Sequence, residues 1–183
     1  MGTGHPASID DLYRVEGKAE IVNGELVLIS AAGGAHGYAA IAISASLFEY
    51  GRRTRSGYAM PDNVGFIVDL PNRRSFSPDA AFWIGAPPTP KFFDGAPAFA
   101  AEVRSAEDSG PAAERRLERK RADYFAAGTL VVWDVVVDPA PQVRRYRADA
   151  TSEPAVFSAG EIADAEPAVP GWTMPVTDLV PLV

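Results

Sequence analysis

The stretch that decides the fold class is Leu130-Val131-Val132-Trp133-Asp134-Val135-Val136-Val137. It is an almost continuous apolar run that is rich in β-branched residues and is interrupted only by one aspartate. Strands that are buried on both faces of a sheet have this composition, whereas half-exposed strands alternate apolar and polar residues. The run therefore predicts an interior strand of a sheet.

The segments on either side of this strand have clear boundaries. Before it, Ser109-Gly110-Pro111 has the residues of a helix start, and Gly128 is typical of a helix end. A helix is therefore expected over 111–127. After the run, a turn that contains prolines leads to a second expected strand at 142–147.

Upstream, short strand patterns are separated by proline-rich turns. They cover 65–70, 74–84 and 99–104. Before them, an amphipathic helix is expected over 36–53. Its apolar face would carry the residues that recur near helical spacing, namely Ile41, Ala45, Leu47, Phe48 and Arg52.

The N-terminal part predicts a short capped helix and a hairpin. Ser8 precedes the expected helix as its N-cap. Apolar strands at 19–22 and 25–29 flank Asn23-Gly24, which is the strongest short signal for a β-hairpin. The order of helix, hairpin, helix, several strands, helix and two strands predicts a mixed α/β or α+β fold with one central sheet.

A chain of 183 residues is long enough for one hydrophobic core. We expect a single domain over 1–183, with an N-terminal segment at 1–12. The C-terminal residues 158–183 are expected to form an irregular arm or one last short element. Trp172 in this arm is expected in the core or at a dimer contact, rather than as a platform for bases.

Composition excludes several classes of protein. Hydrophobic residues make up 47% of the chain and charged residues 22%, as in average soluble domains, and no apolar run is long enough to cross a bilayer. The first residues do not have the pattern of a secretory signal, so a cytoplasmic bacterial protein is expected. The chain contains no cysteine, which excludes disulfides, thiolate chemistry and cysteine zinc sites.

The net charge of −7 is unfavourable for broad contact with nucleic-acid phosphates. Any such contact would use a local basic patch, although each patch also fits an ordinary solvated face. The candidates are Arg52, Arg53, Arg55, Arg73, Arg74, the cluster at 115–121, Arg144, Arg145 and Arg147.

Two acidic residues stand out within the strand patterns. Asp79 follows Pro78 at the start of an apolar run, where proline suits a strand edge or a kink. In 99–104, the alternation of side chains puts Glu102 and Arg104 on a polar face opposite an apolar one. Taken singly, either acid also fits a surface position on an edge strand.

The expected helix at 111–127 carries Lys120 on its apolar face. Most of the charged neighbours fall on faces that are open to solvent, so Lys120 requires a buried or half-buried partner, unless its chain reaches solvent along the edge of the face. Lys120 and the two acids would be ionic partners of one another if they converge at the edge of the sheet. The other members of the face are Ala113, Leu117, Tyr124 and Ala127.

Asp79, Glu102 and the carbonyl of Val103 are oxygen donors of the kind that Mg²⁺ binds, together with water. Such an ion lowers the pKa of bound water and offsets charge on a phosphate, while Lys120 would orient or help deprotonate the water and stabilise the oxyanion. This chemistry fits hydrolysis of a phosphodiester. Two acids in a cleft also fit a glycosidase, but a lysine between them argues against it.

The chain contains an ordered series of motifs. They are Glu20-Ile21-Val22-Asn23-Gly24-Glu25-Leu26, His36, Pro78-Asp79, Glu102-Val103-Arg104-Ser105, Lys120 with Tyr124, Ala127-Gly128 and Trp133 to Pro139. This series resembles the Uma-two family of putative restriction endonucleases, from about residue 13 to the C-terminus. The resemblance implies the PD-(D/E)XK nuclease fold, a mixed sheet flanked by helices with a magnesium-dependent site.

The resemblance also implies roles for single residues. Asp79 and Glu102 would be metal ligands, and Lys120 would be the catalytic lysine, moved from the strand to the following helix. Glu20 would be an additional acid near the metal, and Tyr124 would be a supporting residue. The implied metal is Mg²⁺, with Mn²⁺ as a substitute, the implied partner is DNA, and a homodimer would supply two sites for double-strand cleavage.

Several positions leave the activity open. His36 matches a recurring position of the family, but it also fits the surface at a helix start. Arg116 stands one turn before the lysine, where the family has an acid, and Glu118 is at best a displaced substitute. Arg104 stands where the superfamily often has its lysine, and it cannot act as a base, although it could bind phosphate. The loop at 106–113 lacks the polar, basic character of the family.

Two hypotheses of different classes therefore remain. The first is a magnesium-dependent endonuclease that hydrolyses DNA phosphodiester bonds. The second is a catalytically silent module with the nuclease fold that binds nucleic acid or a protein partner.

Overall fold

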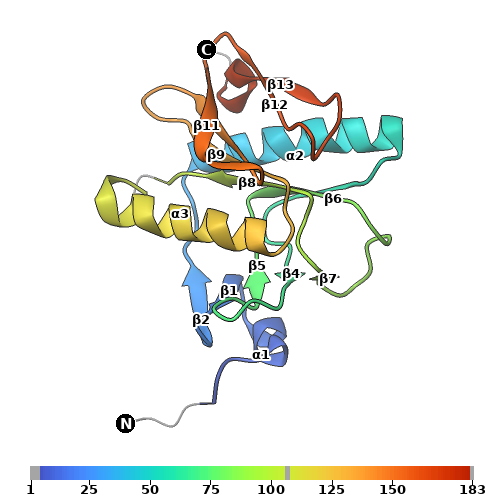
Figure 1. The fold of residues 1–183 in the computed structure, drawn as a ribbon, viewed down its shortest axis with the longest axis vertical. Helices are drawn as coiled ribbons and strands as arrows, with labels where there is room; N and C mark the ends of the chain where they lie inside the picture. Colours follow the sequence, from blue (N-terminus) through green and yellow to red (C-terminus); the bar gives the residue numbers. More distant parts are fainter. Residues whose placement is uncertain (1–4, 106–107, 182–183) are drawn as a thin grey trace.

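The computed structural model describes residues 5–105 and 108–181, and its centre is a six-stranded mixed sheet (Figure 1). The strand order is β11-β10-β9-β8-β6-β3, in which β8 and β9 are parallel and all other neighbours are antiparallel. The strands are β3 (Tyr58–Met60), β6 (Ala80–Trp83), β8 (Phe99–Val103), β9 (Val131–Val136), β10 (Gln142–Arg147) and β11 (Ala150–Ser158). The predicted mixed α+β class and its central sheet are confirmed.

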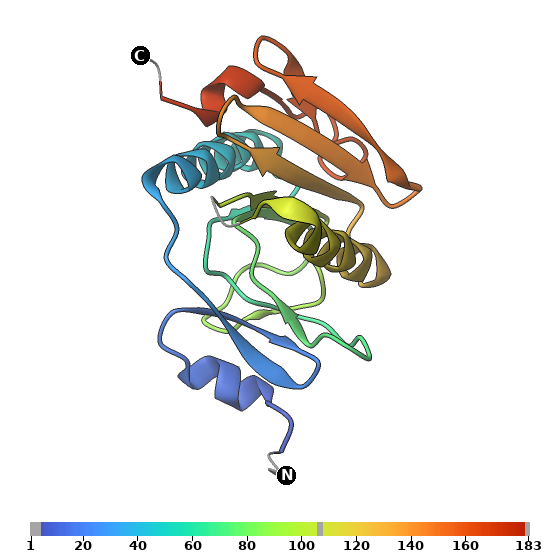
Figure 2. The same ribbon diagram turned by 90° about the vertical axis from the view of Figure 1, so that its left-hand side faces the viewer.

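Two long helices cover opposite faces of this sheet (Figure 2). Helix α2 (Gly34–Thr54) packs on the face that contains Phe99 and Trp133, while α3 (Gly110–Ala126) places Tyr124 against Ala100 and Val132 on the other face. Because β9 is buried between these layers, the apolar run from the sequence is the interior strand that its composition predicted.

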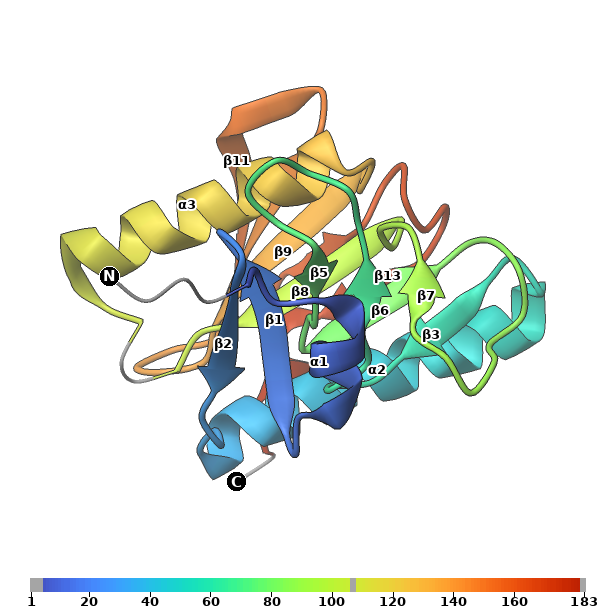
Figure 3. The ribbon, with the colours of Figure 1, turned by 90° about the horizontal axis from the view of Figure 1, so that it is seen from below.

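Smaller elements lie below the central sheet in Figure 1 and face the viewer in Figure 3. Strands β1 (Lys18–Val22) and β2 (Glu25–Ile29) form the predicted hairpin, whose two turn residues have positive φ. Helix α1 (Ile9–Arg14) begins at the predicted Ser8 cap. A three-stranded sheet contains β4 (Phe66–Ile67), β5 (Ser75–Phe76) and β7 (Phe93–Asp94).

The C-terminal segment forms regular structure. Strands β12 (Ile162–Asp164) and β13 (Thr173–Pro175) pair with each other, and a 3₁₀ helix, η1 (Val176–Leu179), follows. Trp172 is buried against Phe99 and Trp133, so its expected position in the core is confirmed. The expected irregular arm or single short element is therefore wrong, because the described part of this segment contains two paired strands and a 3₁₀ helix. The aromatic contacts of Trp172 hold it against the core.

The expected strand at 74–84 is wrong in one respect. The structure divides it into β5 and β6, which belong to different sheets, and the break lies at Ser77-Pro78-Asp79. Proline has no N–H for a strand ladder, so the chain leaves one sheet at Pro78 and enters the other at Asp79. The kink predicted from this proline is therefore a change of sheet.

The expected apolar face of α2 is confirmed for Leu47 and wrong for Ile41 and Phe48. Ile41 and Phe48 are exposed, with 66% and 53% of their surface accessible, whereas Ile43 and Leu47 are fully buried. The buried face contains several small residues, and a Cβ on Gly51 would lie 2.9 Å from the backbone oxygen of Gly57. Close approach of the helix to its neighbours selects the face with small residues, which the size of the apolar side chains does not reveal.

Three further expectations concern a secretory signal, the loop at 106–113 and membrane-spanning segments. Residues 1–4, on which the absence of a secretory signal was judged, and residues 106–107 of the expected loop lie outside the described residues. Within 5–105 and 108–181, no helix has both the length and the apolar character that crossing a bilayer requires.

The packing of α2 gives a matched test of the fold. We expect Ile43→Ala to lower the free energy of unfolding by about 2–5 kcal/mol, because it leaves a cavity between α2 and the sheet. Ile41→Ala removes the same atoms from an exposed position of the same helix and should change stability by about 0.5 kcal/mol or less. Urea denaturation measures both, and equal losses would contradict the assignment of the buried face.

Candidate active site

The change of sheet places Asp79 opposite Glu102. The registered pair Ala80 and Ala101 in β6 and β8 is adjacent to them, and the Asp79 N–H donates to the Ala101 carbonyl over 3.0 Å. Residues that face each other on antiparallel strands project from the same side of the sheet. The Val103 N–H also donates to Asp79 Oδ2 over 2.7 Å, which fixes the orientation of this carboxylate.

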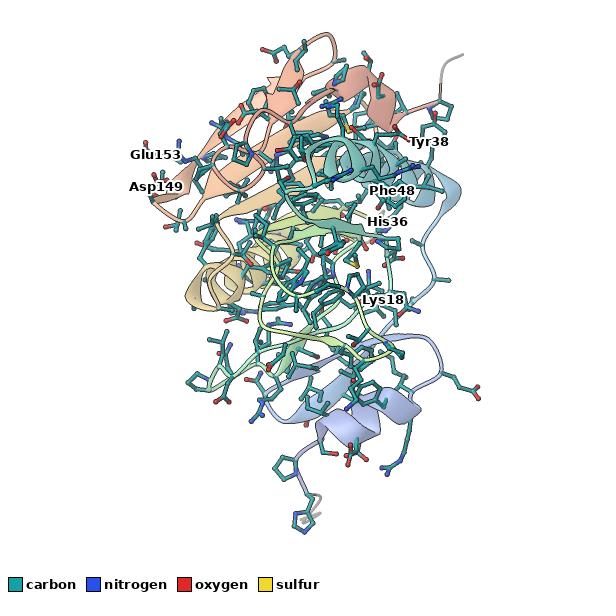
Figure 4. The ribbon with its side chains drawn as sticks, turned by 90° about the vertical axis from the view of Figure 1, so that its right-hand side faces the viewer. Lys18, His36, Tyr38, Phe48, Asp149 and Glu153 are labelled. Atoms are coloured by element: carbon teal, nitrogen blue, oxygen red, sulfur yellow. The ribbon has the colours of Figure 1, made fainter. Side chains whose placement is uncertain are left out.

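Two cationic groups lie at the other oxygen of Asp79. Lys18 Nζ is 2.5 Å and His36 Nε2 is 3.4 Å from Asp79 Oδ1. Lys18 comes from β1 and His36 from the first turn of α2, and Figure 4 shows both on the same side of the molecule. Lys18 also bonds Asp62 over 2.7 Å. His36 is therefore not the free surface residue that was one of its two alternatives.

The charges around Asp79 shift the pKa values of the whole group. Burial raises the pKa of Asp79, but hydrogen bonds and charge from His36 and Lys18 outweigh it and hold the pKa well below its ordinary value. The hydrogen bond to Asp79 raises the pKa of His36, and burial opposes it. Burial lowers the pKa of Lys18, yet the charge of Asp79 raises it overall. Asp79 is therefore ionised at any ordinary pH.

Lys120 lies between two further carboxylates. Its Nζ is 2.7 Å from Glu102 Oε2 and 2.9 Å from Glu20 Oε1, and the Tyr124 hydroxyl donates to Glu102 Oε1 over 2.6 Å. Lys120 and Tyr124 reach Glu102 from one face of α3, as the sequence predicted. The sequence predicted a buried or half-buried partner for Lys120, and the structure provides two, Glu102 and Glu20.

Glu20 also accepts hydrogen bonds from two residues that flank β5. The Ser77 N–H donates to Glu20 Oε1 over 2.9 Å, and Arg73 donates to Glu20 Oε2 over 2.6 Å. The same Arg73 guanidinium donates to Asp123 of α3 over 2.8 Å. Arg73 does not lie on an ordinary solvated face, because it pairs with two largely buried carboxylates.

These contacts set the protonation of the Lys120 group. Burial lowers the pKa of Lys120, but Glu102 and Glu20 outweigh it and raise the pKa above its ordinary value. Burial, together with the charges of Asp79 and Glu20, raises the pKa of Glu102 against the effect of Lys120. Burial and the charge of Glu102 raise the pKa of Tyr124. Lys120 is therefore an ammonium cation and Tyr124 a neutral hydrogen-bond donor.

Arg104 belongs to a separate ionic network. Two of its guanidinium nitrogens each donate to Asp134 over 2.6 Å, and it also pairs with Glu114 of α3. Arg121 of α3 joins the same aspartate over 3.3 Å. Arg104 is thus bound by protein carboxylates and ties the end of β8 to α3, instead of standing free for a phosphate. The unusual Arg116 is exposed and pairs with Asp108.

The sequence identified part of this group and missed the rest. Asp79, Glu102, Lys120, Glu20, Tyr124 and His36 come together, and Val103 contributes its N–H to Asp79. Lys18 was missed, although it shares a strand face with Glu20 because the two are separated by one residue in β1. Arg73 had no local signal, since its role depends on groups 50 and 53 positions away in the sequence.

The donor set is compatible with a divalent cation. Asp79 and Glu102 present oxygens from neighbouring strands, and Mg²⁺ is often held by one or two carboxylates together with water and substrate phosphate. Among residues 5–105 and 108–181, no three His, Asp or Glu side chains gather as a complete metal cage.

The fold is shared with a solved structure. It is similar to the crystal structure of a putative nuclease belonging to DUF820 from Anabaena variabilis ATCC 29413, with a TM-score of 0.74 and 17% sequence identity over 95% of this chain and 97% of that chain. No curated protein matches the chain. The model of the Uma2 family, described as putative restriction endonuclease, matches residues 8–177. The chain belongs to this family, as its motifs indicated.

Neighbouring arginines provide a matched test of the ionic group. We expect Arg73→Met to lower the free energy of unfolding by on the order of 3 kcal/mol, because it removes a buried partner of Glu20 and Asp123. Arg74→Met breaks only an exposed pair with Asp69, so its effect should be about zero. Chemical denaturation of both variants measures the difference, and similar stabilities would contradict the role of Arg73.

The pairing of His36 with Asp79 predicts that the stability of the folded protein depends on pH. The folded metal-free protein should show a His36 pKa above the ordinary value of about 6.5. Protonated His36 then contributes stability that is fully present below about pH 6.5 and is lost as the pH rises through the folded-state pKa. A proton NMR titration measures the pKa of His36. The chain has two histidines, and the signal that His36→Asn removes belongs to His36. A His36 pKa that stays raised in Asp79→Asn would contradict this cause.

Proposed function

We propose that the chain is a magnesium-dependent endonuclease that hydrolyses DNA phosphodiester bonds. The observation that carries the proposal is the convergence of Asp79, Glu102 and Glu20 around Lys120 and Lys18 at one end of β6 and β8. Three largely buried carboxylates and two lysines stabilise a fold no better than apolar residues of similar size would. Membership of a family described as restriction endonucleases supports the same function.

In this proposal Asp79 and Glu102 hold the divalent cation. The ion would lower the pKa of an attacking water and offset charge on the scissile phosphate. The Val103 N–H fixes one oxygen of Asp79, so the other oxygen is the one available to a ligand. Lys18 lies at that second oxygen and would have to move aside, which makes it a competitor of the metal ion.

Lys120 acts through its charge. Burial lowers its pKa, but Glu102 and Glu20 outweigh burial and raise it, which favours the ammonium form. A fixed cation beside the metal ligands is suited to stabilise the negative charge that develops on the phosphate oxygens. Glu20 and Tyr124 are then positioning residues, because Glu20 holds Lys120 and Tyr124 holds Glu102.

A second function is favoured by one feature of the same group. Both oxygens of Asp79 and both oxygens of Glu102 already accept hydrogen bonds from protein donors. With the net charge of −7 and Arg116 in place of an acid, this supports a catalytically silent module that binds nucleic acid or a protein. Such a module would bind DNA equally well with Mg²⁺ and with a chelator, and it would leave the DNA intact.

Cleavage assays test the proposed function. Purified protein should nick supercoiled DNA and cut single-stranded DNA with Mg²⁺ or Mn²⁺. Asp79→Asn, Glu102→Gln and Lys120→Met should each reduce the rate by at least about 100-fold, since each removes a metal ligand or a charge that acts in the transition state.

Matched controls separate loss of chemistry from loss of fold. Lys91→Met and Asp69→Asn make the same chemical changes at exposed positions and should cleave like the parent. Cleavage by the parent that survives in Asp79→Asn and Glu102→Gln would refute this location of the site. DNA binding by the parent without any cleavage would favour the silent module.

A further inference from the structure

A pocket of about 220 Å³ opens next to the candidate active site. It lies between α1, the start of β1, the loop before β4 and the residues that precede β7. This volume is smaller than the pockets that enclose drug-sized ligands, and it suits one flat ring system. The residues that matter for its chemistry are Leu12, Tyr13, Ala19, Asn63, Ser77 and Phe92.

The pocket and the Asp79 group are built on the same three segments. Ala19 follows Lys18, Asn63 follows Asp62, and Ser77 is separated from Asp79 only by one proline. Lys18 and Ala19 project to opposite sides of β1, whereas Asn63 lies in a turn directly after Asp62 and Ser77 lies two residues before Asp79. The pocket therefore adjoins the Asp79 group along these three segments. A ligand in the pocket would therefore lie beside a phosphate group that is bound at the candidate active site.

One wall of the pocket is a fixed aromatic pair. The rings of Tyr13 and Phe92 stack with centroids 4.1 Å apart and planes 6° from parallel. The Phe92 N–H donates to the Tyr13 hydroxyl oxygen over 2.9 Å, so the hydroxyl proton remains able to donate to a ligand. Tyr13 is 47% exposed. This is a rigid ring surface that stays accessible, and few rotamers are lost when a second ring stacks on it.

The remaining lining favours a neutral ligand with a few polar edges. Leu12, Ala19 and the aromatic pair give apolar surface, and none of the described residues that line the pocket carries a charge. Asn63 supplies an amide, and the Ser77 hydroxyl is buried without a hydrogen-bond partner among the described residues. A phosphate or a carboxylate would find no cation here, whereas a heterocyclic base needs this combination of stacking and isolated hydrogen bonds.

We propose that this pocket binds one unpaired nucleobase of the DNA strand whose phosphate lies at the candidate active site. The proposal rests on the proposed function and adds to it the class of substrate. A base inside a duplex cannot enter the pocket unless it leaves the stack, and this costs least where the DNA is single-stranded, mismatched or distorted. The substrate is therefore DNA with an unpaired nucleotide next to the cleaved bond.

Binding without cleavage tests this directly. Two short single strands are compared in Ca²⁺: one carries a single 2-aminopurine between abasic positions, and the other is abasic throughout. The parent should bind the first on the order of tenfold more tightly and quench its fluorescence, because the base stacks on Tyr13. Tyr13→Leu should remove both effects, while Tyr13→Phe, which keeps the ring, should restore the quenching. Tyr58→Leu, at another exposed tyrosine, should behave like the parent.

The outcomes separate the pocket from the catalytic proposal. Equal affinity for the two strands, or unchanged quenching in Tyr13→Leu, overturns the base pocket. The proposed nuclease activity is then decided by the cleavage assay alone. Base binding that depends on Tyr13, in a protein that never cleaves DNA, supports the pocket and refutes the nuclease. Circular dichroism of each variant checks that the loss of binding is not a loss of fold.

Discussion

The contact of Lys120 with Glu102 and Glu20 is the interaction on which the rest of the site depends. Placing one ammonium and two carboxylates in a poorly solvated region is costly, and the cost is offset only while every partner is in position. The three residues come from α3, β8 and β1, so the contact joins the N-terminal hairpin to the central sheet and its helix. Arg73 then extends the same constraint, because it holds Glu20 and Asp123 at once.

A second constraint is the change of sheet at Ser77-Pro78-Asp79. It ends β5 and begins β6, so the residues around the break belong to neither ladder alone. The Ser77 N–H binds Glu20, and Asp79 receives the Val103 N–H together with Lys18 and His36. One short segment thereby fixes the relative positions of the two carboxylate groups. Ser77 also lines the neighbouring pocket.

Sequence reasoning predicted the parts of this arrangement that depend on local patterns. The alternation in 99–104 placed Glu102 on the polar face, and the helical spacing placed Lys120 and Tyr124 on one face of α3, as the structure has them. The hairpin at Asn23-Gly24 and the buried strand β9 were also predicted from local patterns.

What the sequence did not reveal depends on contacts between distant segments. Arg73 looked like a member of a surface pair with Arg74, and only the folded chain brings it to Glu20. The face of α2 was misjudged because tight packing selected small residues over the larger Ile41 and Phe48. Lys18 was overlooked because a lysine beside a hairpin is ordinary until a carboxylate from another sheet approaches it.

The central claim is that Asp79 and Glu102 form a cation site whose place is shared with Lys18. Titration calorimetry with Mn²⁺ tests it most directly, on the parent, Asp79→Asn, Glu102→Gln and Lys18→Met. The account predicts one ion per chain in the parent, no binding in either acid variant, and tighter binding in Lys18→Met because the competing ammonium is gone. Absence of binding in both the parent and Lys18→Met, or unchanged binding in the acid variants, would contradict it.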